Sequence, residues 1–250
     1  MKIGRFKFGS EIIYGIIKGS EVEAIEDLSL KSSGEKIRLG NLKILAPAEP
    51  SKIICIGLNY VDHARELKME IPEEPIIFLK PPTAAIGHGE NIVYPTASKQ
   101  VDYEAELGIV IGKNCKNVTR ENAYDVILGY TCFNDVTARD LQKKDGQWTR
   151  SKSFDTFAPF GPYIVTKEEI RNPQNLDIKL RLNGVIKQDS NTKNFIFDIP
   201  FLIEFVSRIM TLNQGDVIAT GTPPGVGPVK RGDTVEIEIE GIGVLRNFVV

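Results

Sequence analysis

The chain has 250 residues, of which 42% are hydrophobic and 26% are charged, as is usual for a soluble globular protein. Its 31 basic and 33 acidic side chains give a formal net charge of −2, which offers no electrostatic reason to expect nucleic acid or an anionic membrane as a partner. Only two histidines are present, which excludes a metal site built from several histidines.

Nothing in the sequence predicts a membrane-spanning or exported protein. The longest stretch without a charge, residues 217–229, is broken by glycine and proline and is too short for a transmembrane helix. Lys2, Arg5 and Lys7 disfavour a signal peptide. The 3 cysteines are widely spaced and form no CxxC pair, so we expect no disulfide framework and a cytoplasmic location.

The first 44 residues or so are predicted to form short strands joined by tight turns. Two apolar runs, residues 11–17 and 22–25, flank a turn at 18–20. Residues 45–51, with their prolines and small side chains, are typical of a linker. We therefore expect a small N-terminal β subdomain over residues 1–50 and one larger unit over residues 51–250.

Strands dominate the larger unit. Residues 176–183 and 234–240 alternate strictly between apolar and polar side chains, and Asn183-Gly184 predicts a hairpin turn. One helix is predicted from about residue 60 to 68, and another follows Asp198, which would cap it. Few helices, many strands and no regular alternation between them indicate a β-rich α+β fold.

Acidic residues recur at alternate positions in residues 101–111. On a strand, Asp102, Glu104 and Glu106 would share one face. This pattern is typical of a hydrated strand face, but the carboxylates repel one another, and a bound cation would remove the repulsion. Asp135 follows an apolar run and would lie at the end of a predicted strand. There it would act either as a helix cap or as a third ligand. Together with Glu104 and Glu106 it would form an all-oxygen site that suits Mg²⁺ first and Mn²⁺ or Ca²⁺ next.

His63 and Glu66 lie three residues apart in the first predicted helix, so they would share a face. A carboxylate beside an imidazole raises its basicity and fixes its tautomer, as a water-activating general base requires. The alternative is a solvated polar helix surface.

Two further stretches are candidates for ligand contact. The polar segment 139–155 includes Trp148 and Phe154 and would form either a pocket for an anionic substrate or an exposed loop. The glycine-rich segment 220–228 would allow close approach to a ligand or form a rigid turn. It matches neither a P-loop nor a dinucleotide fingerprint.

Six stretches in this order resemble the fumarylacetoacetate hydrolase family. They are GLNYVDHAREL, FLKPPTA, VDYEAELGIVIG, GYTCFNDVTARDLQ, DGQWTRSKSFDTFAPFGP and ATGTPPGVGPV. The resemblance covers most of the chain from about Lys52 to Val250, and the N-terminal segment looks like the small leading region of the compact bacterial and archaeal members. The resemblance implies a catalytic domain with a mixed β-roll or sandwich core, a homodimer, and one Mg²⁺ or Mn²⁺ per subunit.

The resemblance also implies roles for individual residues. The matching metal ligands are Glu104, Glu106 and Asp135. The matching catalytic residues are His63 and Glu66, on a segment that is often a mobile lid in the family, and Lys152 and Gln142, which would contact the substrate or its developing oxyanion. The positions matched near the substrate's carboxylate end or the metal are Arg139, Lys80 and Thr222.

The activity that the resemblance implies is hydrolysis of a C–C bond in acylpyruvate-type 2-oxo acids, which are 1,3-diketo acids, through a metal-bound enolate. Members that share this enolate chemistry also include isomerases of the 2-hydroxyhepta-2,4-diene-1,7-dioate type and oxaloacetate decarboxylases or tautomerases. The His63–Glu66 pair favours hydrolysis or decarboxylation. A non-catalytic metal-binding module is the other alternative, and the pair together with Lys152 argues against it.

Overall fold

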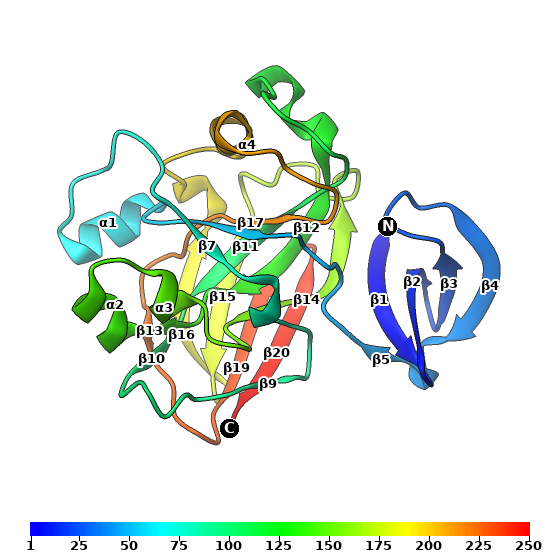
Figure 1. Cartoon of the computed structure of the whole chain (residues 1–250), viewed down its shortest axis with the longest axis horizontal. Helices are drawn as coiled ribbons and strands as arrows, with labels where there is room; N and C mark the ends of the chain where they lie inside the picture. The colour runs from blue at the N-terminus through cyan, green and yellow to red at the C-terminus, as the bar shows by residue number, and fades with distance from the viewer.

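The computed structural model describes residues 1–250, and most of the chain lies in β-strands (Figure 1). The largest sheet is mixed, because most neighbouring strands are antiparallel whereas β17 and β6 run parallel. In spatial order its strands are β4 (Ser32–Arg38), β3 (Glu21–Ile25), β2 (Glu11–Lys18), β1 (Lys2–Phe8), β14 (Ala158–Thr166), β12 (Ile127–Asn134), β11 (Ala105–Ile111), β17 (Val217–Ala219), β6 (Ile53–Ile56) and β7 (Ile77–Lys80), with β5 (Lys43–Ile44) on β1 and β8 (Ala85–Ile86) on β14.

The N-terminal strands continue this sheet through one pairing. Ile3 of β1 lies opposite Ile164 of β14 in an antiparallel register. Figure 1 shows the blue strands β1 to β5 as a lobe to one side of the remaining strands. The expected boundary between two domains at residue 50 stays a prediction. The strands on its two sides are not separate, because β1 and β14 belong to one hydrogen-bonded sheet.

A second sheet packs against β11 and β12 and completes a sandwich. The shared core includes Leu107 and Ile109 from one sheet and Ile178 and Ile237 from the other. Apolar side chains alternate with more exposed ones along β19, as the sequence pattern predicts. The strands of this sheet are, in spatial order, β16 (Val185–Asn191), β15 (Asp177–Leu182), β19 (Thr234–Ile239), β20 (Gly243–Val249) and β9 (Asn91–Ile92). The β-rich α+β prediction is confirmed.

The predicted hairpin turn and the predicted helix cap are both confirmed. Asn183 and Gly184 adopt φ values of 52° and 79° between β15 and β16, which makes the hairpin. The Asp198 carboxylate accepts a hydrogen bond from the Phe201 amide at 2.8 Å and caps the helix that follows. The first predicted helix is slightly shorter than expected and ends where Lys68 takes a left-handed conformation.

The helices are short and gather mainly on one side of the molecule. Figure 1 shows α1, α2 and α3 together at the side away from the N-terminal strands. None of the helices has the length and apolar character needed to cross a membrane. The α-helices are α1 (Val61–Leu67), α2 (Arg139–Asp145), α3 (Thr149–Lys152) and α4 (Ile199–Ile209). The 3₁₀ turns are η1 (Leu39–Asn41), η2 (Pro82–Ala84), η3 (Arg120–Val126) and η4 (Thr192–Asn194). A small third sheet consists of β13 (Thr137–Ala138), β10 (Val101–Tyr103) and β18 (Gly227–Pro228).

Candidate active site

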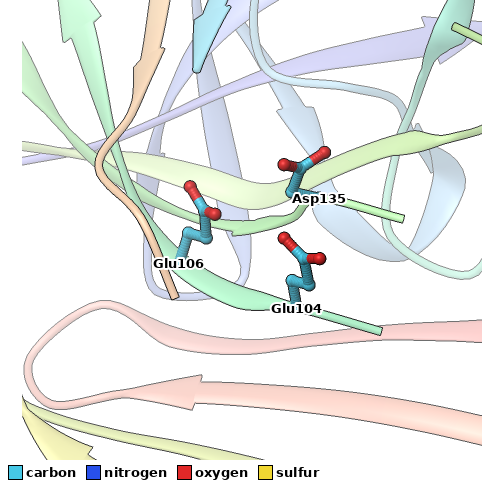
Figure 2. A group of neighbouring side chains, drawn as sticks. All are labelled: Glu104, Glu106 and Asp135. Atoms are coloured by element: carbon cyan, nitrogen blue, oxygen red, sulfur yellow. The ribbon is translucent and has the colours of Figure 1, made fainter. Parts of the chain in front are cut away.

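Three buried carboxylates converge at one end of the large sheet. Glu106 lies on β11, and Glu104 lies in the break between β10 and β11. Asp135 follows β12 directly, and the antiparallel pairing of Ala105 with Asn134 brings it to the same end. Side-chain oxygens of the three residues lie within 4.8 Å of one another. Figure 2 shows the three carboxylates turned toward a common centre, so we call these residues the acidic triad.

The chain next to the triad fixes its geometry. The Asn134 side-chain oxygen accepts a hydrogen bond from the Glu104 amide at 3.0 Å, and the Asp135 amide donates to the Glu104 carbonyl at 2.9 Å. Thr137 Oγ1 lies 3.1 Å from Glu104 Oε1, to which it donates. Glu104 and Asp135 are therefore held together before any ligand binds, which lowers the entropy cost of binding one.

Three cationic side chains surround two members of the triad. Lys152 Nζ lies 3.0 Å from Glu104 Oε2 and 2.6 Å from Asp135 Oδ2. Lys80 pairs with the other oxygen of Asp135, and Arg139 pairs with Glu104. Burial by itself would raise the pKa of Glu104, but the charges of Lys152 and Arg139 lower it to about 2. Burial would lower the pKa of Lys152, and the Asp135 and Glu104 carboxylates instead raise it, so Lys152 stays a cation.

Glu106 differs from the other two because it has no cationic partner. The only hydrogen bond to its carboxylate comes from the Gly221 amide, which lies 2.9 Å from Oε2. Burial, followed by the negative charges of Asp135 and Glu104, raises the pKa of Glu106 well above its ordinary value. A divalent cation would supply the positively charged partner that Glu106 lacks, and carboxylates are ligands that Mg²⁺ and Mn²⁺ accept. The residues therefore fit a divalent cation held by Glu104, Glu106 and Asp135.

The contact between Gly221 and Glu106 requires glycine. Gly221 has a φ of +96°, and a Cβ atom there would lie 2.7 Å from Asn59 Cβ. We expect Gly221→Ala to lower the free energy of unfolding by about 2 kcal/mol, because strain and a backbone shift add together. The shift should also weaken Mg²⁺ binding, measured by isothermal titration calorimetry. Gly232→Ala is the control, since Gly232 has a φ of +92° and open space around it. Equal Mg²⁺ affinity in the two variants would contradict the prediction.

His63 and Glu66 form the predicted pair on α1. His63 Nδ1 lies 2.9 Å from Glu66 Oε2, which leaves Nε2 of the imidazole free of that contact. Glu66 also accepts a hydrogen bond from the Gly225 amide at 3.1 Å. One turn earlier in the helix, Asp62 accepts from Ser190 Oγ at 2.7 Å. These contacts attach α1 to both neighbouring segments and fix the direction of the imidazole.

A cavity of about 230 Å³ brings most of the predicted site residues together. Of the predicted residues, those that line it are His63, Glu104, Glu106, Asp135, Arg139, Gln142, Lys152 and Thr222. Glu66 lines a neighbouring cavity of about 500 Å³, which shares His63 with the first. Lys80 lines neither cavity and lies fully buried against Asp135 and the Val136 carbonyl. Trp148 lines the first cavity as the sequence suggests, whereas Phe154 packs against Phe157 instead.

One residue that holds the site together was not predicted from the sequence. Asn59 is fully buried and donates to the Thr220 carbonyl at 2.7 Å. Its side-chain oxygen accepts from the Phe197 amide at 2.8 Å. The only signal in the sequence is a lone amide side chain directly after an apolar run, and that signal does not reveal its partners.

A mixed β fold that carries a buried all-oxygen cation site beside a histidine–carboxylate pair defines a candidate metal-dependent enzyme. The model of the fumarylacetoacetate (FAA) hydrolase C-terminal family matches residues 52–250, and an Rv2993c-like N-terminal model matches residues 1–47. The chain belongs to the fumarylacetoacetate hydrolase family, as the sequence resemblance predicts.

Similar proteins in this family are named for different activities. The mitochondrial oxaloacetate tautomerase fahd2 of Xenopus laevis is 48% identical over 232 residues, which cover 89% of this chain and 73% of the relative. The crystal structure of 5-carboxymethyl-2-hydroxymuconate delta-isomerase from Mycobacterium smegmatis has a TM-score of 0.93 at 43% identity and covers 100% of this chain and 99% of its own. Maleylpyruvate hydrolase from Sphingobium sp. SYK-6, in complex with manganese(II) and pyruvate, has a TM-score of 0.83 at 33% identity with the same coverage.

Proposed function

We propose that this protein is a hydrolase that depends on Mg²⁺, or else Mn²⁺, and cleaves a C–C bond in acylpyruvate-type 2-oxo acids. The observation that carries the proposal is the hydrogen-bonded pair of His63 and Glu66 beside the cavity that holds the acidic triad. A protein that only binds a cation has no need of a base at this place. When bound, the cation would supply Lewis-acid polarisation of the two neighbouring oxygens of a 2-oxo acid.

His63 supplies the base. With Nδ1 engaged by Glu66, Nε2 is the atom that takes a proton from water, and the carboxylate stabilises the imidazolium that forms. The hydroxide adds to the carbonyl carbon of the acyl group, and the bond from this carbon to the neighbouring methylene then breaks. The proton on His63 is available to the methylene carbon, so the products are a carboxylic acid and pyruvate.

Lys152 and Gln142 would stabilise the negative charge that develops on the acyl oxygen. Lys152 is held protonated by its carboxylate neighbours and is therefore a donor, not a base. Gln142 Oε1 accepts from Arg139 at 2.6 Å, which leaves its Nε2 free to donate. Donors that are fixed before reaction stabilise such an oxyanion at little reorganisation cost.

The second candidate is tautomerisation or isomerisation, or the decarboxylation of oxaloacetate, which loses CO₂ but passes through the same kind of enolate. The names of the Xenopus tautomerase and the Mycobacterium isomerase favour this alternative. A substrate without a distal carbonyl offers no carbon for hydroxide to attack, and the same base would then move a proton between atoms of the substrate.

A proton NMR time course distinguishes the candidates. The protein is supplied with Mg²⁺ and, in separate tubes, acetylpyruvate, oxaloacetate or a 2-hydroxydienedioate, each with an EDTA control. We expect pyruvate and acetate to appear from acetylpyruvate only when metal is present. Pyruvate from oxaloacetate alone would move the assignment to decarboxylase, and a shifted double bond alone would move it to isomerase.

A further inference from the structure

The strand β16 lies outside the cavity that holds the acidic triad, yet its side chains reach the chain next to the triad and next to His63. None of its residues lines that cavity or the neighbouring one. It is an edge strand of the second sheet, where it pairs only with β15. Gln188 and Ser190 are two residues apart on β16 and share a face, whereas Asp189 between them points the other way and is exposed.

Gln188 is buried and reaches the strand that carries the acidic triad. Its Oε1 atom accepts a hydrogen bond from the Ala105 amide at 2.9 Å, and Ala105 lies between Glu104 and Glu106. The pairing of β17 with β11 ends at Gly108, so the Gln188 side chain makes a contact with β11 that a longer strand would otherwise make. The positions of both glutamates therefore depend on a side chain from the second sheet.

The same side chain also holds the glycine-rich segment 220–228. Gln188 Nε2 donates to Thr222 Oγ1 at 2.9 Å and to the Pro223 carbonyl at 2.8 Å. Thr222 Oγ1 in turn donates to the Ala105 carbonyl at 2.9 Å, which closes a ring of hydrogen bonds. Both polar atoms of the Gln188 amide are used, so this buried amide has a single orientation.

Segment 220–228 lies directly against the backbone of β16. A Cβ atom on Gly225 would lie 2.1 Å from the Lys187 carbonyl oxygen, so only glycine allows this approach. The Gly225 amide donates to Glu66, which is the partner of His63. The position of Glu66 is therefore tied to β16 through Gly225.

Ser190 holds the residue immediately before His63. Its Oγ atom donates to Asp62 Oδ2 at 2.7 Å, and Asn194 Nδ2, just after β16, donates to the same oxygen at 3.1 Å. The other oxygen of Asp62, Oδ1, accepts from the His63 amide at 3.0 Å. The backbone of His63 is thus connected to β16 through one carboxylate.

From these contacts we propose that β16 fixes the position of His63 relative to the cation site, with Gln188 and Ser190 as positioning residues. Gln188 acts on the acidic triad through Ala105, and Ser190 acts on His63 through Asp62. The connection matters because a catalytic arrangement tolerates errors of only about 0.5 Å. The inference rests on the proposed function for the role of His63 as the base, but the geometry that it predicts is measured without turnover.

Paramagnetic relaxation by Mn²⁺ measures the distance on which the inference depends. Mn²⁺ suits the all-oxygen triad, and it broadens the signal of a nearby proton to a degree that falls steeply with distance. With isotope-labelled histidine, only two ring signals are observed, because the chain has 2 histidines. His88 is the internal reference, since it lies in the turn between β8 and β9 and lines neither cavity. The variant His88→Gln assigns the two signals.

Removal of the Ser190 hydroxyl is expected to displace the base and to leave the cation site intact. In Ser190→Ala the imidazole should move by more than about 0.5 Å, so the relaxation of the His63 signal at saturating Mn²⁺ should differ from that of the wild type. Mn²⁺ affinity in calorimetry should stay within about twofold of wild type, since the residues that support the triad are kept. For acetylpyruvate, kcat should fall by about 10-fold while KM is unchanged, because the base and not the binding site is disturbed. Ser190→Thr keeps the hydroxyl and should restore the wild-type values.

Removal of the Gln188 amide is expected to weaken cation binding. Gln188→Met keeps the length and approximate volume of the side chain and removes its hydrogen bonds, and Mn²⁺ affinity should fall by about 10-fold, at the lower end of the cost of losing a residue that supports a metal ligand. Gln188→Glu is the second variant, because it keeps the acceptor for Ala105 but loses the amide donors, and a smaller loss in the same direction is expected. Asp189→Asn is the control on the exposed face of the same strand, and it should change neither Mn²⁺ affinity nor the His63 signal.

The outcomes separate this inference from the proposed function. Wild-type relaxation of His63 in Ser190→Ala together with wild-type Mn²⁺ affinity in both Gln188 variants, or equal effects in Asp189→Asn, would overturn the inference and leave the hydrolase unaffected. No pyruvate release by the wild type, with the expected relaxation and affinity changes present, would overturn the hydrolase and keep the positioning role of β16. No binding of Mn²⁺ by the wild type would overturn the cation site and this inference together.

Discussion

Replacing Glu106 by glutamine is expected to abolish Mg²⁺ binding and, at the same time, to stabilise the cation-free protein. The substitution removes one of the three carboxylates that we propose as ligands, and we expect at least a 100-fold loss of affinity, since even the loss of a residue that only supports a ligand costs about 10- to 100-fold. The amide oxygen can still accept the hydrogen bond from Gly221, so the local structure is kept.

The stabilisation follows from the raised pKa of Glu106. A carboxyl group with a higher pKa in the folded state than in the unfolded state stabilises the fold at low pH, and this contribution is lost as the pH rises through the folded-state pKa. Without metal, the unfolded state therefore gains relative to the folded state as the pH rises above the ordinary pKa of a glutamate, because Glu106 ionises more readily in the unfolded chain. In EDTA, we expect the wild-type melting temperature to fall relative to that of Glu106→Gln as the pH is raised above 5.

The control for Glu106→Gln is Asp102→Asn, which alters another buried carboxylate close to the triad but outside it. We expect calorimetry to show Mg²⁺ affinity within a few-fold of wild type for the control. A loss as large as that of Glu106→Gln would mean that overall negative charge, not coordination by the triad, governs cation binding.

The second large effect is expected for His63→Asn. Without an imidazole no group remains to take the proton of the attacking water, so kcat for acylpyruvate hydrolysis should fall by about 1,000-fold. Mg²⁺ affinity should be unchanged, because His63 does not belong to the triad. Glu66→Gln should fall less, by about 10- to 100-fold, since the imidazole remains and only its orientation and charge stabilisation are weakened.

Pyruvate release in a coupled assay gives kcat for both variants, and Trp148 fluorescence shows whether 2-oxo acids still bind. Full hydrolysis by His63→Asn would remove the general-base role from His63 and leave the hydrolase proposal without its base. Loss of Mg²⁺ binding in this variant would instead indicate that the substitution disturbs the triad.

The sequence predicts those parts of the fold that depend on neighbouring residues. Alternation along β19, the turn at Asn183-Gly184 and the cap at Asp198 are local features, and all three were found. The pairing of β1 with β14 could not be predicted, because a period of two residues shows which face of a strand is buried but not which strand lies beside it.

The site follows the same division. The family stretches identify the triad and the His63–Glu66 pair, whose members lie close in sequence or at strand ends. Alternation along a strand does not predict the position of Asp102. The strand is interrupted between β10 and β11, and Asp102 pairs with Arg139 instead of joining the triad. The position of Lys80 behind Asp135, outside the cavity, depends on the pairing of β7 with β6 at the edge of the large sheet.

The segment after β17 touches both parts of the candidate site, the acidic triad and the His63–Glu66 pair. The Gly221 amide donates a hydrogen bond to Glu106 of the acidic triad, and the Gly225 amide donates one to Glu66 of the His63–Glu66 pair. Between these two contacts the chain acts as a fixed spacer. Insertion or deletion of a residue there would change the distance between cation and base, so we expect the length of this segment to be under strict selection, whereas the hairpin at Asn183-Gly184 is free to vary.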